Sequence, residues 1–476
     1  MQPKLSKQLL ALLALLLALG LYLINPLGVS ANGNKVIAVA ALMIALWVTE
    51  AMPMAVVALL PLVVFPLTGI ATINVTATAY SNPVIYLFLG GFMLALAIEK
   101  CHLHRRIALN IIKITGTSGN HIILGFILAT GLLSMWLSNT ATTMMMLPIA
   151  MSVVQVFREA NQNHKGIRNF SASVMIAIAL SSNFGGIATI IGTPPNVAYV
   201  AYITKKYDYN ISFFNWMMLC LPLALLLMGT LYLVMVKWLY PNRLQSDENA
   251  KLLVQDQVKA LGPVSTPEKR VLLVFLIIAF LWISRQFINQ LTGLQLDDNM
   301  IAIICAISLF IIPSGKKNIA LLEWKDTKNM AWGILLLFGG GIALASALEN
   351  AGLIQQLGSW FAGFSNNHLV LILMVATISI FVSEVMSNVA QVIVFAPVVS
   401  SLAEAAGMHP LMLGIPMTLA ASCASMLPMG TPPNAIAFSS GFIKLNDMVR
   451  VGFVMNIISI ILVTLFCWIF LPLIIK

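Results

Sequence analysis

Two short polar motifs each occur twice within otherwise apolar sequence. Ser-x-x-x-Ser-Asn lies at 134–139 and 383–388, and Gly-Thr-Pro-Pro-Asn lies at 192–196 and 430–434. Their hydroxyl, amide and carbonyl oxygens suit a hard monovalent cation, and their N–H and O–H donors suit a carboxylate. None of the four segments contains Lys or Arg. An anion bound between them would therefore need bound cations and helix N-termini to balance its charge.

Gly-Thr-Pro-Pro-Asn predicts a broken helix. The two prolines remove two backbone donors and push the preceding residue, Thr193 or Thr431, out of the helical region. A new half-helix is then expected to begin near Asn196 or Asn434. Carbonyls left unpaired by the break favour a cation, and the free N–H groups at the new helix start favour an anion.

The Ser-x-x-x-Ser spacing predicts that two hydroxyls lie one helical turn apart on the same face. This applies to Ser134 with Ser138 and to Ser383 with Ser387. A single motif of this kind often serves only to hold membrane helices together. Two copies facing two broken helices instead favour a pair of binding sites.

The composition sets the class of protein that must position these motifs. The chain has 476 residues, of which 60% are hydrophobic and 9% are charged, whereas soluble domains carry roughly 25% charged residues. This excludes a soluble protein and predicts an all-α polytopic membrane protein, because only spans with internally closed hydrogen bonds tolerate lipid. Two long apolar stretches, 121–157 and 367–404, are each interrupted by Ser-Asn and predict re-entrant hairpins. About eleven transmembrane helices are predicted by length, near 8–25, 35–51, 53–70, 82–98, 170–190, 212–238, 270–290, 298–313, 330–348, 410–428 and 448–474.

The basic residues predict an orientation. With the N-terminus inside, 20 of the 26 Lys and Arg fall on cytoplasmic segments, which is the bias expected of a membrane protein. The net charge of +10 is therefore interpreted as a topology signal, and no nucleic acid is expected. We expect a cell (inner) membrane protein with a cytoplasmic N-terminus and an outside C-terminus. The residues assigned to the outside are Lys35, Lys205, Lys206, Arg285 and Lys476.

The chain also repeats itself. Leu87-Phe88-x-Gly90-Gly91 recurs 250 residues later, and the same offset pairs Glu99 with Glu349. The Ser-Asn motifs are offset by 249 and the Gly-Thr-Pro-Pro-Asn motifs by 238. Because one hairpin enters from each side, an inverted-topology pair is predicted, as in secondary transporters. The predicted divisions are an N-terminal helix at 1–34, a first repeat at 35–240 with its broken helix at 170–204, a cytoplasmic linker at 241–269, and a second repeat at 270–476 with its broken helix at 410–444.

The motifs together resemble the divalent anion/sodium symporter (DASS) family. The resemblance extends from Trp47-Val48-Thr49-Glu50-Ala51-Met52-Pro53 to the C-terminus and is most specific at Ser138-Asn139-Thr140, at both Gly-Thr-Pro-Pro-Asn motifs and at 422–428. It implies a homodimer in lipid with an elevator mechanism. It also implies sodium-coupled symport of C4-dicarboxylates such as succinate, malate and fumarate, with citrate as a further candidate, and at least two Na+ ions.

Residue by residue, the resemblance implies two sodium sites and one substrate site. The sodium residues would be Ser134, Ser138, Asn139 and Gly192 in the first repeat, and Ser383, Asn388, Gly430 and Pro432 in the second. The substrate residues would be Ser138, Asn139, Thr140, Thr193, Ser387, Asn388, Val389, Thr431 and Pro432. Val389 stands where the family often has Thr, and Ser425 stands where it commonly has Phe.

Three alternatives remain. One is a sodium-coupled symporter of sulfate or another inorganic dianion. Another is a proton-coupled or exchange-type carboxylate transporter, for which Glu384 inside the second hairpin would be the candidate acid; a structural or site-tuning role is the favoured interpretation of Glu384. The third, an intramembrane enzyme, is disfavoured because His-Glu-x-x-His and Gly-x-Ser-x-Gly motifs are absent. We therefore expect a transporter and no enzyme.

Overall fold

The computed structural model describes residues 6–474, apart from 27, 117, 161–165, 243, 246–247, 317 and 354–366. Lys4, Lys165, Arg243, Lys317 and Lys476, which enter the charge count, lie outside the described residues. The named elements in the described part are all helices, and nine of them are long and apolar enough to cross a membrane. The prediction of an all-helical polytopic membrane protein is confirmed.

The described residues of the first half form twelve α-helices, one short 3-10 helix (η1) and one short π-helix (η2). They are α1 (Lys7–Ile24), α2 (Ala31–Thr49), α3 (Met54–Val57), α4 (Leu60–Thr68), α5 (Ile73–Thr78), η1 (Ala79–Ser81), α6 (Pro83–Lys100), α7 (Leu103–Thr115), α8 (Gly119–Ser134), α9 (Asn139–Ala160), α10 (Ile167–Gly186), α11 (Pro194–Tyr207), α12 (Phe213–Leu233) and η2 (Val234–Leu239). The span predicted at 53–70 is interrupted between α3 and α4, where Pro61 opens the second helix. A proline there fits a first helical turn, which needs no N–H at that position.

The second half repeats the order of hairpin, broken helix and long final helix. Its described elements are α13 (Glu248–Ala260), α14 (Thr266–Thr292), α15 (Asp298–Ile311), η3 (Trp324–Asn329), α16 (Trp332–Asn350), α18 (His368–Ser383), α19 (Asn388–Ala405), α20 (Leu411–Ser422), α21 (Pro432–Ser439) and α22 (Leu445–Ile474). The predicted linker at 241–269 thus contains the helix α13. Both predicted hairpins are present as helix pairs, α8 with α9 and α18 with α19.

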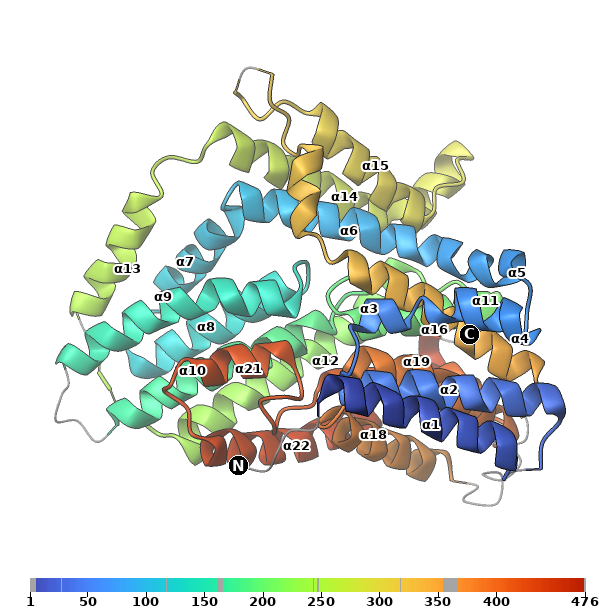
Figure 1. The fold of residues 1–476 in the computed structure, drawn as a ribbon. Helices are drawn as coiled ribbons and strands as arrows, with labels where there is room; N and C mark the ends of the chain where they lie inside the picture. Colours follow the sequence, from blue (N-terminus) through green and yellow to red (C-terminus); the bar gives the residue numbers. More distant parts are fainter. Residues whose placement is uncertain are drawn as a thin grey trace.

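Packing divides the helices into two groups. The site group comprises α8–α12 and α18–α22, and the frame group comprises α1–α6 and α14–α16. Figure 1 shows α8, α9, α10 and α21 together on the left, and α18, α19 and α11 on the right. Each hairpin therefore packs with the first half-helix of its own repeat and the second half-helix of the other. The two hairpins therefore take equivalent places in the two repeats, each against one broken helix of each half.

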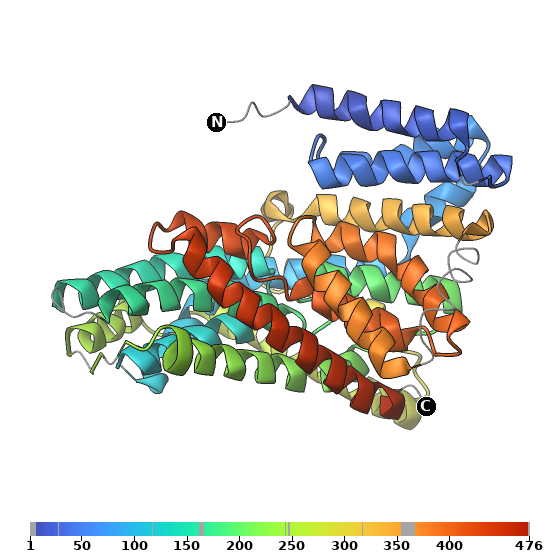
Figure 2. The same ribbon diagram turned by 90° about the horizontal axis from the view of Figure 1, so that it is seen from below.

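The frame group presents a largely apolar exterior. The dark blue α1 lies along α2 at one edge of the molecule (Figure 2), and only Ala14 and Ala18 of α1 are buried. Helix α14 is likewise mostly exposed, with Leu273, Phe280 and Phe287 among its uncovered side chains. In a membrane protein such faces are expected to contact lipid.

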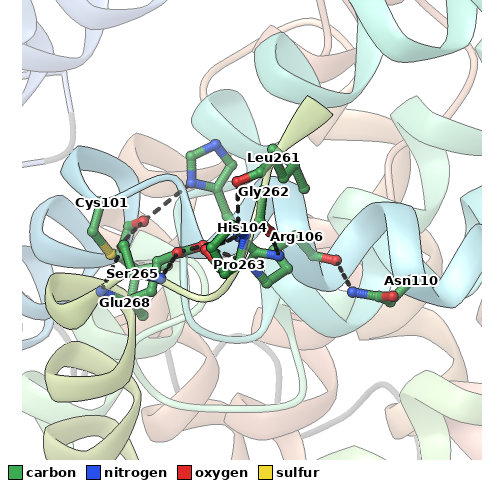
Figure 3. A network of polar contacts seen from close by, with 10 residues as sticks. Cys101, His104, Arg106, Asn110, Leu261, Gly262, Pro263, Ser265 and Glu268 are labelled. Atoms are coloured by element: carbon green, nitrogen blue, oxygen red, sulfur yellow. Dashed lines mark hydrogen bonds and ion pairs between the residues drawn. The ribbon is translucent and has the colours of Figure 1, made fainter. Parts of the chain in front are cut away.

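One polar network ties the linker to α7. Arg106 Nε lies 2.6 Å from Glu268 Oε1, and both side chains are mostly buried. Glu268 also completes a capping box with Ser265 at the start of α14. The guanidinium donates further hydrogen bonds to the carbonyls of Leu261, Gly262 and Pro263 (Figure 3). The end of the linker is therefore fixed to the helix that precedes the first hairpin.

Candidate binding site at the two hairpin tips

The two serines of each Ser-Asn motif do not share a helical face. Helix α8 ends at Ser134, the chain turns through 135–138, and α9 begins at Asn139. In the second hairpin α18 ends at Ser383 and Ser387 is the N-cap of α19. The prediction of one-turn spacing on one face was wrong, because the helix stops at the first serine.

At the first tip the Asn139 amide instead faces three oxygen atoms, from Ser134, Ser182 and Gly192. Asn139 Oδ1 lies 2.7 Å from Ser134 Oγ, and it faces the carbonyl oxygens of Ser182 at 3.1 Å and Gly192 at 3.2 Å. A reversed amide would place its nitrogen there and donate to all three atoms. A hard cation between them would instead hold the oxygen in this position. The structure thus brings together Ser134, Asn139 and Gly192, three of the four residues predicted for the first cation.

Ser138, the fourth of these residues, faces its own helix. Its Oγ accepts a hydrogen bond from the Ala141 N–H at 3.3 Å, and its carbonyl accepts one from Thr142. The hydroxyl therefore satisfies a free donor in the first turn of α9. Ser138 lies beside the cluster rather than within its hydrogen bonds.

Glycine makes the close approach of these elements possible. A Cβ atom on Gly186 would lie 2.3 Å from Asn139 Oδ1, and one on Gly192 would lie 2.4 Å from the Gly186 carbonyl oxygen. Real Cβ atoms essentially never come so near another atom. Both glycines are therefore needed for the break in the helix to reach the hairpin tip.

The second tip repeats the serine–asparagine contact. Ser383 Oγ lies 2.7 Å from Asn388 Oδ1 and 2.6 Å from the Ala421 carbonyl oxygen. Gly430 donates its N–H to the Leu427 carbonyl, and Pro432 is the exposed first residue of α21. Of the four residues predicted for the second cation, hydrogen bonding joins Ser383 to Asn388, and Ala421 is an unforeseen neighbour.

Both broken helices are present. Helix α10 ends at Gly186 and α11 starts at Pro194 with Thr193 as its N-cap. Helix α20 ends at Ser422 and α21 starts at Pro432 with Thr431 as its N-cap. The half-helices begin two residues earlier than predicted, because proline is well suited to a first helical position.

The motif asparagines pair with the carbonyls that each break leaves free. Asn196 Nδ2 donates to the carbonyls of Thr189 at 2.8 Å and Ile187 at 3.4 Å. Asn434 Nδ2 donates to the Leu427 carbonyl at 3.2 Å. Both asparagines are buried, and an unpaired buried carbonyl would be costly. The asparagine of Gly-Thr-Pro-Pro-Asn therefore stabilises the break itself.

Glu384 stabilises the second break by a different means. Its buried carboxylate accepts hydrogen bonds from the N–H groups of Ser425, Met426 and Leu427 at 2.8–2.9 Å and from Asn456 Nδ2 at 2.7 Å. In the first repeat Met135 stands at this position, and Thr189 Oγ1 donates to its carbonyl at 2.5 Å. The carboxylate thus clamps the second hairpin tip to the break between α20 and α21. This geometry supports the structural role and not proton coupling.

Sequence reasoning missed the link between the two broken helices. Asn183 on α10 donates to Thr431 Oγ1 at 3.1 Å and to Asn434 Oδ1 at 3.4 Å. Asn183 and its neighbours Ser181 and Ser182 are three polar residues in a row on a helix that is otherwise mostly apolar. That interruption is the signal that could have identified them.

Seven of the nine residues predicted to contact substrate are half-buried or exposed, and the other two, Thr193 and Thr431, are buried. Ser134 and Ser383 are fully buried, and Thr193 and Thr431 are 4% exposed. The half-buried tip residues are Ser138, Asn139, Thr140, Ser387, Asn388 and Val389. The arrangement can hold cations at the serine–asparagine pairs while a ligand approaches the tips. A cavity of about 420 Å³ lies elsewhere, beside Lys205, Lys206 and Glu349.

Two hairpins that meet two broken helices inside an all-helical membrane fold define a secondary transporter. The chain belongs to the family described as "Sodium:sulfate symporter transmembrane region", whose sequence profile matches residues 4–475. The membership confirms the resemblance inferred from the motifs.

Relatives and structural neighbours agree with this assignment. The chain is 38% identical to the "Sodium-dependent dicarboxylate transporter SdcS" of Staphylococcus aureus strain USA300, over 97% of this chain and 90% of the relative. It is 37% identical to the protein of the same name in strain MRSA252, with the same coverage. Two solved structures share the fold at 13% identity: the Alcanivorax borkumensis YdaH transporter (TM-score 0.54, 84% of this chain and 87% of that one) and Neisseria gonorrhoeae MtrF (TM-score 0.55, 85% and 83%).

Proposed function

We propose that the protein is a sodium-coupled symporter of small dicarboxylates, with succinate, malate and fumarate as substrates and citrate as a further candidate. The relatives named as sodium-dependent dicarboxylate transporters support this substrate and this coupling ion. The site supports it independently, because it offers oxygen atoms for cations and short polar side chains for carboxylates.

The observation that carries the proposal is the cluster of oxygen atoms around Asn139, with a similar pair at Asn388. Each asparagine amide lies 2.7 Å from a buried serine hydroxyl, and backbone carbonyls of the adjoining broken helix lie nearby. Neither tip nor either break contains Lys or Arg. Bound sodium is therefore the source of positive charge for a dianion, which couples the two bindings directly.

In this scheme one sodium ion binds at each tip. The first lies among Ser134, Asn139 and Gly192, with Ser138 beside it, and the second lies near Ser383 and Asn388, with Gly430 and Pro432 on the facing loop. The carboxylates of the substrate contact the two tips from the space between them. The proposed substrate residues are Ser138, Asn139, Thr140, Ser387, Asn388 and Val389, with Thr193, Thr431 and Pro432 at the half-helix starts.

The proposal extends to the setting in the membrane. The protein lies in the cell (inner) membrane with its N-terminus inside and its C-terminus outside, as the basic residues indicate. It functions as a homodimer, and the site group moves against the frame group in an elevator mechanism. The division of the helices by packing supports this movement, because the hairpins and broken helices pack mainly with one another.

Uptake of labelled succinate into proteoliposomes tests the proposal. Uptake should require an inward sodium gradient and should stop when choline or potassium replaces sodium. Equal uptake without sodium would refute the coupling. Competition by unlabelled succinate, malate, fumarate, citrate and 2-oxoglutarate then defines the substrate class.

Sulfate is the second candidate substrate, because the family is described as a sodium:sulfate symporter. The two tips differ by one hydroxyl, Thr140 against Val389, and such an asymmetric site fits a substrate with two separated charged ends better than a compact dianion. Competition by sulfate at millimolar concentration, with no effect of malate, would favour the second candidate over the first.

A further inference from the structure

The two equivalent half-helices are packed differently. Helix α11 packs against α6 and α16 of the frame group as well as against α19 and α20, and 195–203 are all buried. Helix α21, its counterpart in the other repeat, packs on α9 and α10, and Pro432, Ala435 and Ser439 stay exposed. The packing is therefore closed around α11 and open around α21.

An ion pair lies where α11 meets the frame group. Lys206 Nζ at the end of α11 is 3.3 Å from Glu349 Oε1 at the end of α16, and the Lys206 side chain is only 10% exposed. The pair borders the cavity of about 420 Å³ beside α5. It is one of the few charged contacts that join the described parts of the site group and the frame group.

The sequence repeat places a second acid and a second lysine at the positions equivalent to Glu349 and Lys206. Glu99 occupies on α6 the position that Glu349 occupies on α16, at the offset of 250. Lys444 follows Asn434 by ten residues, as Lys206 follows Asn196. Glu99 and Lys444 are both exposed, and the ion pairs recorded within the described part of the chain involve neither.

We propose that Lys206–Glu349 and Lys444–Glu99 are alternative ion pairs that hold opposite transport states. The first holds the state seen here, with α11 closed against α6 and α16. When the site group moves so that α21 packs against the frame group, the first pair separates and Lys444 meets Glu99. The inference rests on the proposed transport function, since it requires two alternating states.

The exchange suits a transporter for a physical reason. Glu99 and Lys444 are exposed here, and Lys206 and Glu349 border the cavity beside α5, so water can solvate the charges of whichever pair is separated. Because each pair exists in only one state, loss of one partner shifts the equilibrium between the states. Removal of Glu349 and removal of Glu99 should therefore act in opposite directions.

Cross-linking between introduced cysteines tests the exchange, in a variant whose five native cysteines are replaced. Lys206→Cys with Glu349→Cys and Lys444→Cys with Glu99→Cys should both be joined by a short bifunctional thiol reagent, each trapping a different state. Glu349→Cys with Lys444→Cys, from opposite ends, is the control that should not react. Cross-linking of the first pair without the second, under all sodium and succinate conditions, would overturn the proposal.

A labelling experiment measures the shift in equilibrium without relying on transport. Ala435→Cys places a thiol on the exposed face of α21, and its rate of reaction with a maleimide reports how often that face is open. Glu349→Gln should slow the labelling at least twofold, Glu99→Gln should not slow it, and the exchange Lys206→Glu with Glu349→Lys should restore the original rate. Unchanged labelling in Glu349→Gln would refute the exchange of ion pairs.

The outcomes separate this inference from the proposed function. Sodium-dependent succinate uptake, together with failed cross-linking between positions 99 and 444, would support the proposed symport and refute the exchange of ion pairs. If both cysteine pairs are cross-linked, each in a different state, but succinate is not taken up, the exchange of ion pairs is supported and the proposed substrate is refuted.

Discussion

At the scale of single residues, Asn139 and Asn388 make the same serine contact in the two repeats. Each is the first residue of the returning hairpin helix, and each turns its amide back to the last serine of the preceding helix at 2.7 Å. The serines, Ser134 and Ser383, are fully buried. Both tips thus hold an asparagine amide against a buried serine hydroxyl, and this pair is the candidate cation site in each repeat.

Replacing either asparagine should abolish sodium-dependent uptake. Asn139→Ala and Asn388→Ala each remove an oxygen that no neighbouring side chain replaces, so we expect succinate uptake to fall at least 100-fold in proteoliposomes. Asn210→Ala, at an exposed position outside the site, is the matched control and should transport normally. Normal uptake by either tip variant would contradict the paired-site geometry.

Val389 leaves the second tip one hydroxyl short of the first. Val389→Thr restores a donor for a substrate carboxylate, and a hydrogen bond to a charged group contributes about 1.5–3 kcal/mol. The KM for succinate should therefore fall by about tenfold or more, with a smaller effect on kcat. The reverse substitution, Thr140→Val, should raise the KM, and equal KM values in all three proteins would exclude contact at these positions.

Glu384 should be sensitive to length as well as charge. Glu384→Asp withdraws the carboxylate from the N–H groups of Ser425, Met426 and Leu427, and Glu384→Gln replaces one accepting oxygen by a donor. We expect both variants to fold and to lose most of their maximal uptake rate, because the second break is no longer held. Wild-type uptake in Glu384→Asp would show that the clamp is dispensable.

The sequence predicted which residue types meet, and the structure corrected how they meet. Ser134 with Asn139 and Ser383 with Asn388 could be foreseen because each motif occurs twice in an apolar setting. The structural role favoured for Glu384 agrees with its contacts, but its partners, the backbone of 425–427, and the partner of Asn183, Thr431, could not be foreseen because they are distant in sequence. Spacing also could not show that α8 and α18 end at the first serine, since that depends on the tip packing against the break.

At the scale of elements, the breaks are positioned by glycine as much as by proline. Proline stops the hydrogen-bond ladder, but Gly185, Gly186 and Gly192 let the broken segment approach α8 and the tip of the first hairpin. A Cβ on Gly185 would lie 2.2 Å from the Gly131 carbonyl oxygen. Helix, break and hairpin therefore form one packed unit.

Gly186→Ala should displace the Asn139 amide from the oxygen cluster at the first tip. The new Cβ would collide with Asn139 Oδ1 at 2.3 Å, so the amide must move and sodium affinity should fall more than tenfold. The measurement is the sodium concentration that gives half-maximal succinate uptake. Gly229→Ala on α12 is the matched control, because nothing lies within 4 Å of its Cβ; it should transport normally and be slightly more stable, since alanine favours a helix over glycine. A similar sodium dependence in both variants would contradict the prediction.

Most helices could be predicted from the length of the apolar runs and from the positions of proline. Two features could not: the interruption within 53–70 and the helix α13. The hairpins were predicted because Ser-Asn interrupts apolar runs that are too long for a single membrane span. The broken helices were predicted because Pro-Pro interrupts an apolar helix. The division of 53–70 into α3 and α4 was not, because the run remains apolar across the interruption. Helix α13 was also missed, because its polar sequence gives no membrane signal.

At the scale of the whole molecule, charge is concentrated at the ends of the helices and in the linker. Only 9% of the residues are charged, and the ion pairs in the described part mostly join segments far apart in sequence. Arg168 with Asp447, Lys100 with Asp326 and Arg106 with Glu268 each connect the two halves of the chain. These contacts fix how the halves are assembled, while the candidate site itself carries no cationic side chain.

The Arg106 network provides the last prediction, because it anchors the linker to α7 (Figure 3). Arg106→Leu leaves Glu268, with a side chain only 6% exposed, without its partner, and orphaning a buried charge costs about 3–5 kcal/mol. The thermal unfolding midpoint in detergent should fall by several degrees, and adding Glu268→Gln should recover part of the loss, because the charge is removed while the cap to Ser265 is kept. Arg105→Leu, at the exposed neighbouring position, is the control and should unfold like the wild type. If Arg105→Leu is as destabilising as Arg106→Leu, the effect comes from the general loss of positive charge and not from the anchored linker.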